Sequence, residues 1–131
     1  MSFNCRIVVA DDNRDAADSL VAILTVMGYE VTAAYDGREA VEACAAFAPG
    51  LAILDVQMPL LDGCSAARLI RASANPPGVI AALSGVRHWD EPIKSQSAVF
   101  DVRLAKPVRM EELRSLLEWA PGPGSRDPGS R

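Results

Sequence analysis

Several residue types and patterns are scarce in this chain of 131 residues, and each scarcity excludes a class of protein. The three cysteines, Cys5, Cys44 and Cys64, lie far apart and form no CxxC pair. Neither a disulfide framework nor a zinc site is therefore indicated. No apolar run approaches the roughly 20 residues that span a bilayer, and the first residues lack the apolar stretch of a signal peptide. We expect a soluble, cytoplasmic protein with reduced thiols and no membrane segment.

Positive charge and aromatic side chains are also scarce. The chain has 13 Lys and Arg against 17 Asp and Glu, a formal net charge of -4. Surfaces that bind nucleic acids or anionic membranes need clustered Lys and Arg, so we expect no direct nucleic-acid binding. Aromatic residues make up 5% of the chain and hydrophobic residues 50%, so the core must consist mainly of Ala, Val, Leu and Ile. The length fits one domain.

Short apolar segments alternate with segments in which apolar residues recur at helical spacing. The predicted strands are residues 5–10, 30–34, 51–54, 79–83 and 102–105. The predicted helices lie around residues 16–27, 40–47, 63–73 and 110–117, with a weaker one at 86–98. Strand and helix units joined by short connections predict an α/β fold, a parallel sheet covered on both faces. We place this domain in residues 1–120, and the Gly, Pro, Ser and charged residues of 121–131 predict a disordered tail or linker.

Polar side chains follow four of the five predicted strands. Asp11 and Asp12 follow the first strand, Asp55 the third, Ser84 the fourth and Lys106 the fifth. The carboxyl ends of parallel strands lie at one edge of a sheet, where ligands of such folds bind. Singly, these residues are typical of turns, helix starts or surface charges, but their shared position predicts that they converge on one pocket.

Three carboxylates gathered there would repel one another, by about 3 kcal/mol for a pair at roughly 5 Å and an effective dielectric near 20. A hard divalent cation relieves this repulsion, and Mg²⁺ suits a site with few carboxylates that leaves positions open for water and phosphate oxygens. Carboxylates also accept phosphoryl groups. In such a reaction Lys106 would pair with a phosphate oxygen and Ser84 would donate a hydrogen bond to another.

The ordered motifs resemble the receiver domain of two-component response regulators. The resemblance covers about residues 5–119 and is carried by VVADD at 8–12, LDVQMP at 54–59, DG at 62–63, LSG at 83–85 and KPV at 106–108. It implies a flavodoxin-like, doubly wound sheet of five parallel strands in the order 2-1-3-4-5. It also implies a phosphoacceptor signalling module, which assists only its own phosphorylation and dephosphorylation and is not an enzyme.

The resemblance further implies a role for each residue of the pocket. Asp55 would be the phosphorylated residue. Asp12 would bind Mg²⁺ directly, Asp11 would bind it through water, and the backbone carbonyl of Gln57 would complete the protein ligands. Ser84 would be the switch hydroxyl, and Lys106 would bind the phosphoryl group. The donor would be a phosphohistidine on a histidine kinase or phosphotransfer protein. The phosphorylated domain would then change its affinity for an output protein or domain not identified by the sequence, and a homodimer is left open.

Two observations bear on how this module works. Arg103 occupies the position, three before Lys106, where the family often has an aromatic residue that turns inward. A long cation does not bury in a small apolar pocket, so we expect no such rotation of Arg103. Aspartyl-phosphate hydrolases commonly carry a second Asp two residues after the nucleophile, and Gln57 stands there instead.

Other functions remain as alternatives to the phosphoacceptor. A hydrolase passing through an aspartyl-phosphate is disfavoured by Gln57, and a nucleotide or flavin module by the absence of a glycine-rich loop after the first strand. A receiver that keeps the fold but is not phosphorylated, acting as a binding module, also fits the pattern.

Overall fold

The computed structural model describes residues 6–58, 60–85 and 100–119. Within them the elements are β1 (Arg6–Ala10), α1 (Arg14–Val26), β2 (Glu30–Ala34), α2 (Gly37–Phe47), β3 (Leu51–Asp55), α3 (Gly63–Arg71), β4 (Val79–Ser84), β5 (Val102–Ala105) and α5 (Met110–Trp119). The helix predicted at 86–98 and the tail predicted at 121–131 lie outside the described residues.

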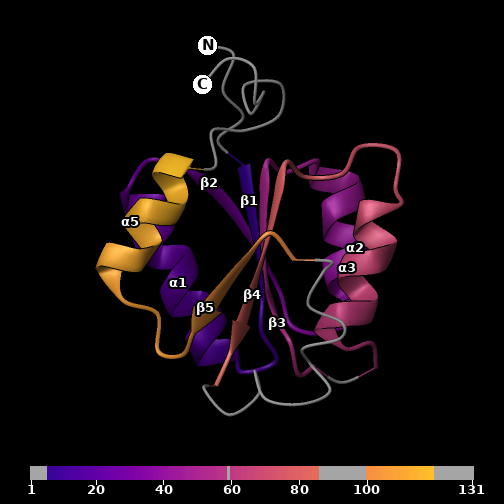
Figure 1. The fold of residues 1–131 in the computed structure, drawn as a ribbon, viewed down its shortest axis with the longest axis horizontal. Helices are drawn as coiled ribbons and strands as arrows, with labels where there is room; N and C mark the ends of the chain where they lie inside the picture. The colour runs from indigo at the N-terminus through magenta and orange to yellow at the C-terminus, as the bar shows by residue number, and fades with distance from the viewer. Residues whose placement is uncertain (1–5, 59, 86–99, 120–131) are drawn as a thin grey trace.

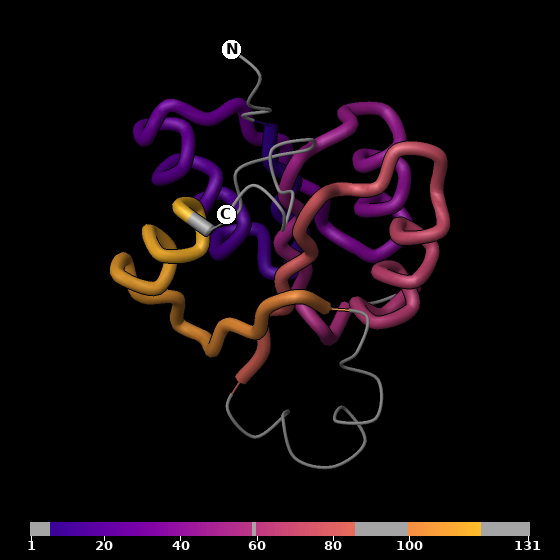
Figure 2. Tube along the Cα trace, turned by 45° about the horizontal axis from the view of Figure 1, so that its top comes forward, coloured from indigo at the N-terminus to yellow at the C-terminus, as the bar shows by residue number. Residues whose placement is uncertain are grey.

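All five strands are parallel and form one sheet in the order β2-β1-β3-β4-β5. Helices α1 and α5 cover one face of this sheet, and α2 and α3 cover the other (Figure 1). The same two layers are visible in the tilted view of Figure 2. The predicted α/β class, the strand order and the parallel arrangement are therefore confirmed.

The core lies in two layers, one on each side of the sheet. Successive strand residues point to opposite faces, so Val8 packs toward α2 and α3 while Val9 packs toward α1 and α5. Many of the buried strand residues are Ala or Val, as the composition predicted. Leu24 of α1 and Leu113 of α5 close the second layer, both almost fully buried.

Side-chain caps fix the starts of the helices beside the carboxyl edge of the sheet. The carboxylate of Asp36 accepts a hydrogen bond from the backbone N–H of Glu39 at 2.8 Å. The Glu39 carboxylate in turn accepts one from the N–H of Tyr35, also at 2.8 Å. Asp36 and Glu39 thus form a capping box, the arrangement that their spacing of three residues at a helix start indicates. Asp62 caps α3 by accepting from the N–H of Ser65 at 2.8 Å.

The structure differs from the sequence prediction at the ends of several elements, and three of these differences lie near the carboxyl ends of strands or at a helix end. β3 includes Asp55, which pairs in register with Leu83, and β4 includes Ser84, which pairs with Ala105. Ladder pairing therefore continues one residue beyond the apolar runs. Helix α3 ends at Arg71, two residues earlier than predicted, where the N–H of Ser73 reaches the carbonyl of Ile70 in a tighter turn.

Two apolar residues at helical spacing in α1, Ala16 and Ile23, are exposed and do not pack in the core. Ile23 is 38% exposed, whereas Ala17, Leu20 and Leu24 are buried.

Among the described helices, none combines the length and the hydropathy needed to cross a bilayer.

Candidate functional site

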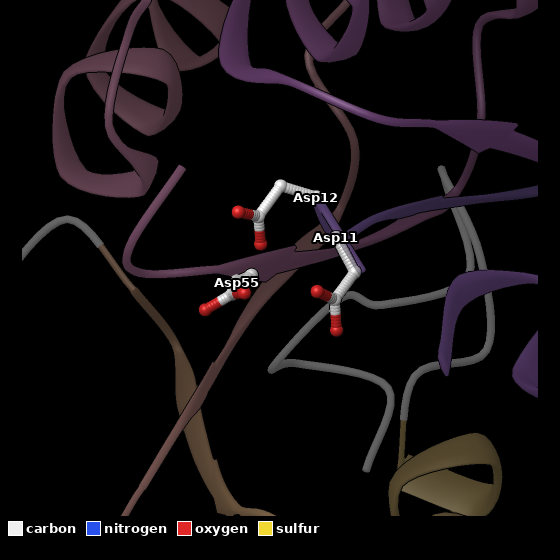
Figure 3. A group of neighbouring side chains, drawn as sticks. All are labelled: Asp11, Asp12 and Asp55. Atoms are coloured by element: carbon white, nitrogen blue, oxygen red, sulfur yellow. The ribbon is translucent and has the colours of Figure 1, made fainter. Parts of the chain in front are cut away.

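Three carboxylates meet at the carboxyl ends of β1 and β3. Asp11 and Asp12 follow β1, and Asp55 is the last residue of β3 (Figure 3). One oxygen of each carboxylate lies within 4.8 Å of the others. Asp11 and Asp55 are 2% and 5% exposed, while Asp12 faces solvent. The convergence expected from strand order is therefore observed, and Asp55 is more buried than a residue beyond the core would be.

Backbone hydrogen bonds orient the two buried carboxylates. The Oδ1 atom of Asp55 accepts a hydrogen bond from the N–H of Gln57 at 3.1 Å. The Oδ1 atom of Asp11 accepts one from the N–H of Asn13 at 3.0 Å. Each carboxylate is thus held by the backbone two residues later, which leaves its second oxygen directed at the pocket.

Lys106 bridges these second oxygens from the end of β5. Its ammonium Nζ lies 2.9 Å from Oδ2 of Asp55 and 3.2 Å from Oδ2 of Asp11. The backbone N–H of Lys106 donates to the carbonyl of Ser84 at 2.9 Å, which ties the lysine to the neighbouring strand end. Lys106 is therefore a direct partner of Asp55, although the two residues are 51 positions apart in the sequence.

The electrostatics of the pocket reflect burial and crowding. The pKa of Asp55 is raised from 3.8 to about 6, mainly by burial and also by the neighbouring Asp11 carboxylate, against the opposing effects of Lys106 and the Gln57 N–H. Burial alone would lower the pKa of Lys106, but its hydrogen bonds and charge interactions with Asp55 and Asp11 outweigh this and raise it. The pocket therefore favours an additional positive charge.

These residues fit a hard divalent cation. With the three carboxylates ionised, the charges of Asp11, Asp12, Asp55 and Lys106 sum to about -2, which one divalent ion balances. All the side-chain donors are oxygens, the ligands that Mg²⁺ prefers over nitrogen or sulfur. One of the three is exposed, so the site opens to solvent and to a second reactant.

Two further residues lie next to this cluster, Ser84 at the end of β4 and Gln57 in the loop that follows β3. Ser84 is 1% exposed and directly follows Leu83, the register partner of Asp55. Its hydroxyl donates to the carbonyl of Gly85 at 3.2 Å. Gln57 has an exposed side chain, and its described contact with the cluster is through the backbone.

Sequence reasoning missed one residue of the site, Asn13. Its side chain accepts a hydrogen bond from the N–H of Ala16 at 3.1 Å and so caps α1, while its own N–H orients Asp11. Asn directly before a helical apolar pattern is a common N-cap, so a capping search would have found it.

Arg103 lies away from the pocket. It is exposed on β5 and lines an open groove of about 380 Å³ together with Glu111 and Glu112 of α5. Its register partner is Ala82, which packs in the α2 and α3 layer, so the exposed Arg103 side chain points to that face of the sheet and is not packed in the core.

The sequence of this chain is similar to that of known proteins. A family model described as the response regulator receiver domain matches residues 7–118. The response regulator MprA of Mycolicibacterium vanbaalenii is 39% identical over 110 residues, which is 82% of this chain and 46% of that protein. The transcriptional regulatory protein PrrA of Mycobacterium tuberculosis is 37% identical over the same shares of the two chains. The chain thus spans about half the length of the curated relatives it matches.

Solved structures agree with the family model. The receiver domain of the sensor histidine kinase PA1611 from Pseudomonas aeruginosa, with magnesium in its active-site cleft, is 30% identical at a TM-score of 0.78, over 89% of this chain and 97% of that one. The response regulator TrrA of Thermotoga maritima, in complex with Mg²⁺ and BeF, is 28% identical at a TM-score of 0.75, over 86% and 96%. The chain belongs to the receiver domain family of response regulators.

Proposed function

We propose that this receiver domain accepts a phosphoryl group on Asp55 in a reaction that depends on Mg²⁺. The observation that carries the proposal is the position of Asp55, a buried carboxylate at a strand end with Lys106 at 2.9 Å and two more carboxylates in reach of the same cation. Family membership supports it, because receiver domains are signalling modules and not classical enzymes.

In the proposed reaction a carboxylate oxygen of Asp55 attacks the phosphorus of a phosphohistidine. The new P–O bond forms as the P–N bond breaks, and the released imidazole takes up a proton from solvent. Lys106 already touches Asp55, so a small movement transfers its ammonium to a phosphoryl oxygen, where negative charge accumulates. Ser84, at the next strand end, supplies a hydroxyl donor to another oxygen.

Asp11, Asp12, Asp55 and the backbone carbonyl of Gln57 are the proposed ligands of the cation. When bound, Mg²⁺ neutralises the carboxylates and the incoming phosphoryl oxygens. Asp12 is exposed and therefore accessible to a hydrated ion without rearrangement, whereas Asp11 must share its Oδ2 atom between Lys106 and the ion or its water. The magnesium-containing receiver structures support this assignment.

The partners of the domain are also proposals. The donor would be a histidine kinase or a phosphotransfer protein, and the signal would pass to an output protein or domain through a changed interaction face. The relatives carry the names response regulator and transcriptional regulatory protein, and this chain corresponds to about half of each. We place the domain in the cytoplasm, where kinases and reduced thiols are found.

The test is phosphorylation by acetyl phosphate in Mg²⁺, followed by intact-mass analysis. Wild type should gain one phosphoryl group, and Asp55→Asn should gain none. Asp62→Asn is the matched control, because it makes the same chemical change at a nearby residue, whose carboxylate caps α3. Addition of EDTA should abolish the adduct. An adduct of equal size on Asp55→Asn, or none on wild type with any donor or candidate kinase, would disprove the proposal.

A further inference from the structure

The loop between β3 and α3 carries Gln57, and two contacts with other backbone segments fix its shape. At its base the N–H of Gly63 donates to the carbonyl of Val56 at 2.8 Å. The N–H of Val56 donates in turn to the carbonyl of Leu83 at 2.9 Å, which attaches this end of the loop to β4. At its far end the backbone of Leu61 lies against the first residue of α2, Gly37.

The contact at Gly37 is too close for any side chain. A Cβ atom added there would overlap the carbonyl oxygen of Leu61 and lie 2.7 Å from the Leu61 Cβ atom. The backbone of Gly37 is not in the left-handed region, which among the described glycines is occupied by Gly28. Glycine at position 37 is therefore required by the space that the loop occupies, and not by the conformation of the helix start.

The contact is also favourable in its electrostatics. The first turn of α2 presents backbone N–H groups that have no partner within the helix, together with the positive end of the helix dipole. The carbonyl oxygen of Leu61, which carries partial negative charge, lies directly against this end. The start of α2 thus both attracts the loop and limits how far it can move.

Of the two partners in this contact, the helix is the more firmly held. Its start is fixed by the capping box, and Ala40 and Cys44 anchor it in the core. In the loop, Leu60 has a φ of 68° and a side chain that is 75% exposed, a conformation that leucine adopts reluctantly. An atom added at Gly37 would therefore displace the loop and leave the helix in place.

We propose that Gly37 is a positioning residue for the metal site, in that the bare start of α2 sets the β3–α3 loop and with it the carbonyl of Gln57. The inference rests on the proposed function, in which that carbonyl is a ligand of the cation. Gly37 does not touch the reacting groups. It acts through Leu61 and the closed loop that joins Leu61 to Val56.

The test compares Mg²⁺ binding to wild type and Gly37→Ala by calorimetric titration. Substitutions of residues that support metal ligands commonly weaken metal binding 10- to 100-fold. We expect a Kd at least ten times higher in Gly37→Ala. The Mg²⁺ concentration that gives half-maximal phosphorylation by acetyl phosphate should rise by the same factor, while the rate at saturating Mg²⁺ stays within about threefold of wild type.

Two further variants separate positioning from general loss of stability. Cys44→Ala removes a buried atom from the same helix and leaves Gly37 in place, so it should lower stability and keep the wild-type Kd. Leu60→Gly relieves the positive φ, and the double variant Gly37→Ala/Leu60→Gly should still bind Mg²⁺ at least ten times more weakly than Leu60→Gly. The double variant decides the question if Gly37→Ala alone fails to fold.

The proposal is overturned if Gly37→Ala, or the double variant against Leu60→Gly, binds Mg²⁺ with an unchanged Kd. It is also overturned if Cys44→Ala weakens binding as much as Gly37→Ala. The titration needs no phosphoryl donor, so its result is independent of whether Asp55 is the acceptor.

Discussion

Removing the negative charge of Asp55 should stabilise the protein when no divalent cation is present. Burial is the main reason that the pKa of Asp55 is raised from 3.8 to about 6. Its ionised form is thus less favourable in the folded protein than in the unfolded chain, despite the hydrogen bond from Lys106 at 2.9 Å. Asp55→Asn keeps the shape and the acceptor oxygen but is neutral at every pH, so it avoids this cost.

The magnitude follows from the pKa difference between the two states. A rise of about two units corresponds to about 3 kcal/mol at 1.36 kcal/mol per unit, as an upper value. The folded state binds the Asp55 proton more tightly than the unfolded state does. The contribution of Asp55 to stability is therefore fully present below about pH 4, is lost as the pH rises to about 6, and stays lost above that.

Urea unfolding followed by far-UV circular dichroism in EDTA measures this difference. At pH 7.5 Asp55→Asn should be more stable than wild type by up to about 3 kcal/mol, and at pH 4 the two should agree. Asp62→Asn again serves as the control, because Asn caps helices about as well as Asp and should change stability little at either pH.

Magnesium should reduce the difference in stability between the two proteins. A cation at 100 times its Kd stabilises the folded state by about 2.7 kcal/mol, and Asp55→Asn lacks one of the proposed ligands. Wild type should therefore gain more stability from Mg²⁺ than the variant. The reasoning is refuted if Asp55→Asn is less stable than wild type at pH 7.5 in EDTA, or if the difference between them does not shrink toward pH 4.

Three other predictions follow from the same geometry. Lys106→Met removes the partner of two buried carboxylates, so urea unfolding in EDTA should show that the free energy of unfolding falls by about 2 kcal/mol. Calorimetry should show tighter Mg²⁺ binding, because no ammonium competes with the ion. Unchanged stability and affinity would contradict the ion-pair geometry. Burial raises the pKa of the Cys44 thiol to about 12, so this thiol should be unreactive in the folded protein. In the variant Cys5→Ser, a thiol reagent at pH 8 should therefore react at Cys44 only after unfolding in urea. Rapid reaction of the folded protein would be the contrary result. Beryllofluoride-bound and free crystal structures should both show the Arg103 guanidinium exposed to solvent, and a swing of this group into the core would show that the burial argument is wrong.

The sequence by itself determined the fold class and the neighbourhood of the site. Apolar runs that end in Asp11, Asp55, Ser84 and Lys106 are local patterns, and they alternate with helical ones. Given a parallel sheet, the position of every strand end follows from chain direction alone. The capping box at Asp36 was likewise legible, because a cap depends on residues three positions apart.

Only the tertiary structure decided how these groups contact one another. The relative placement of β1, β3 and β5 lets Lys106 bridge Asp11 and Asp55. It also buries Asp55 within the sheet, and the raised pKa of Asp55 follows from that burial. The contact between Gly37 and Leu61 is of the same kind, because it joins the start of α2 to the loop between β3 and α3. A local pattern carries no distance between segments that are far apart in the chain, and these distances are set by the packing of side chains throughout the core.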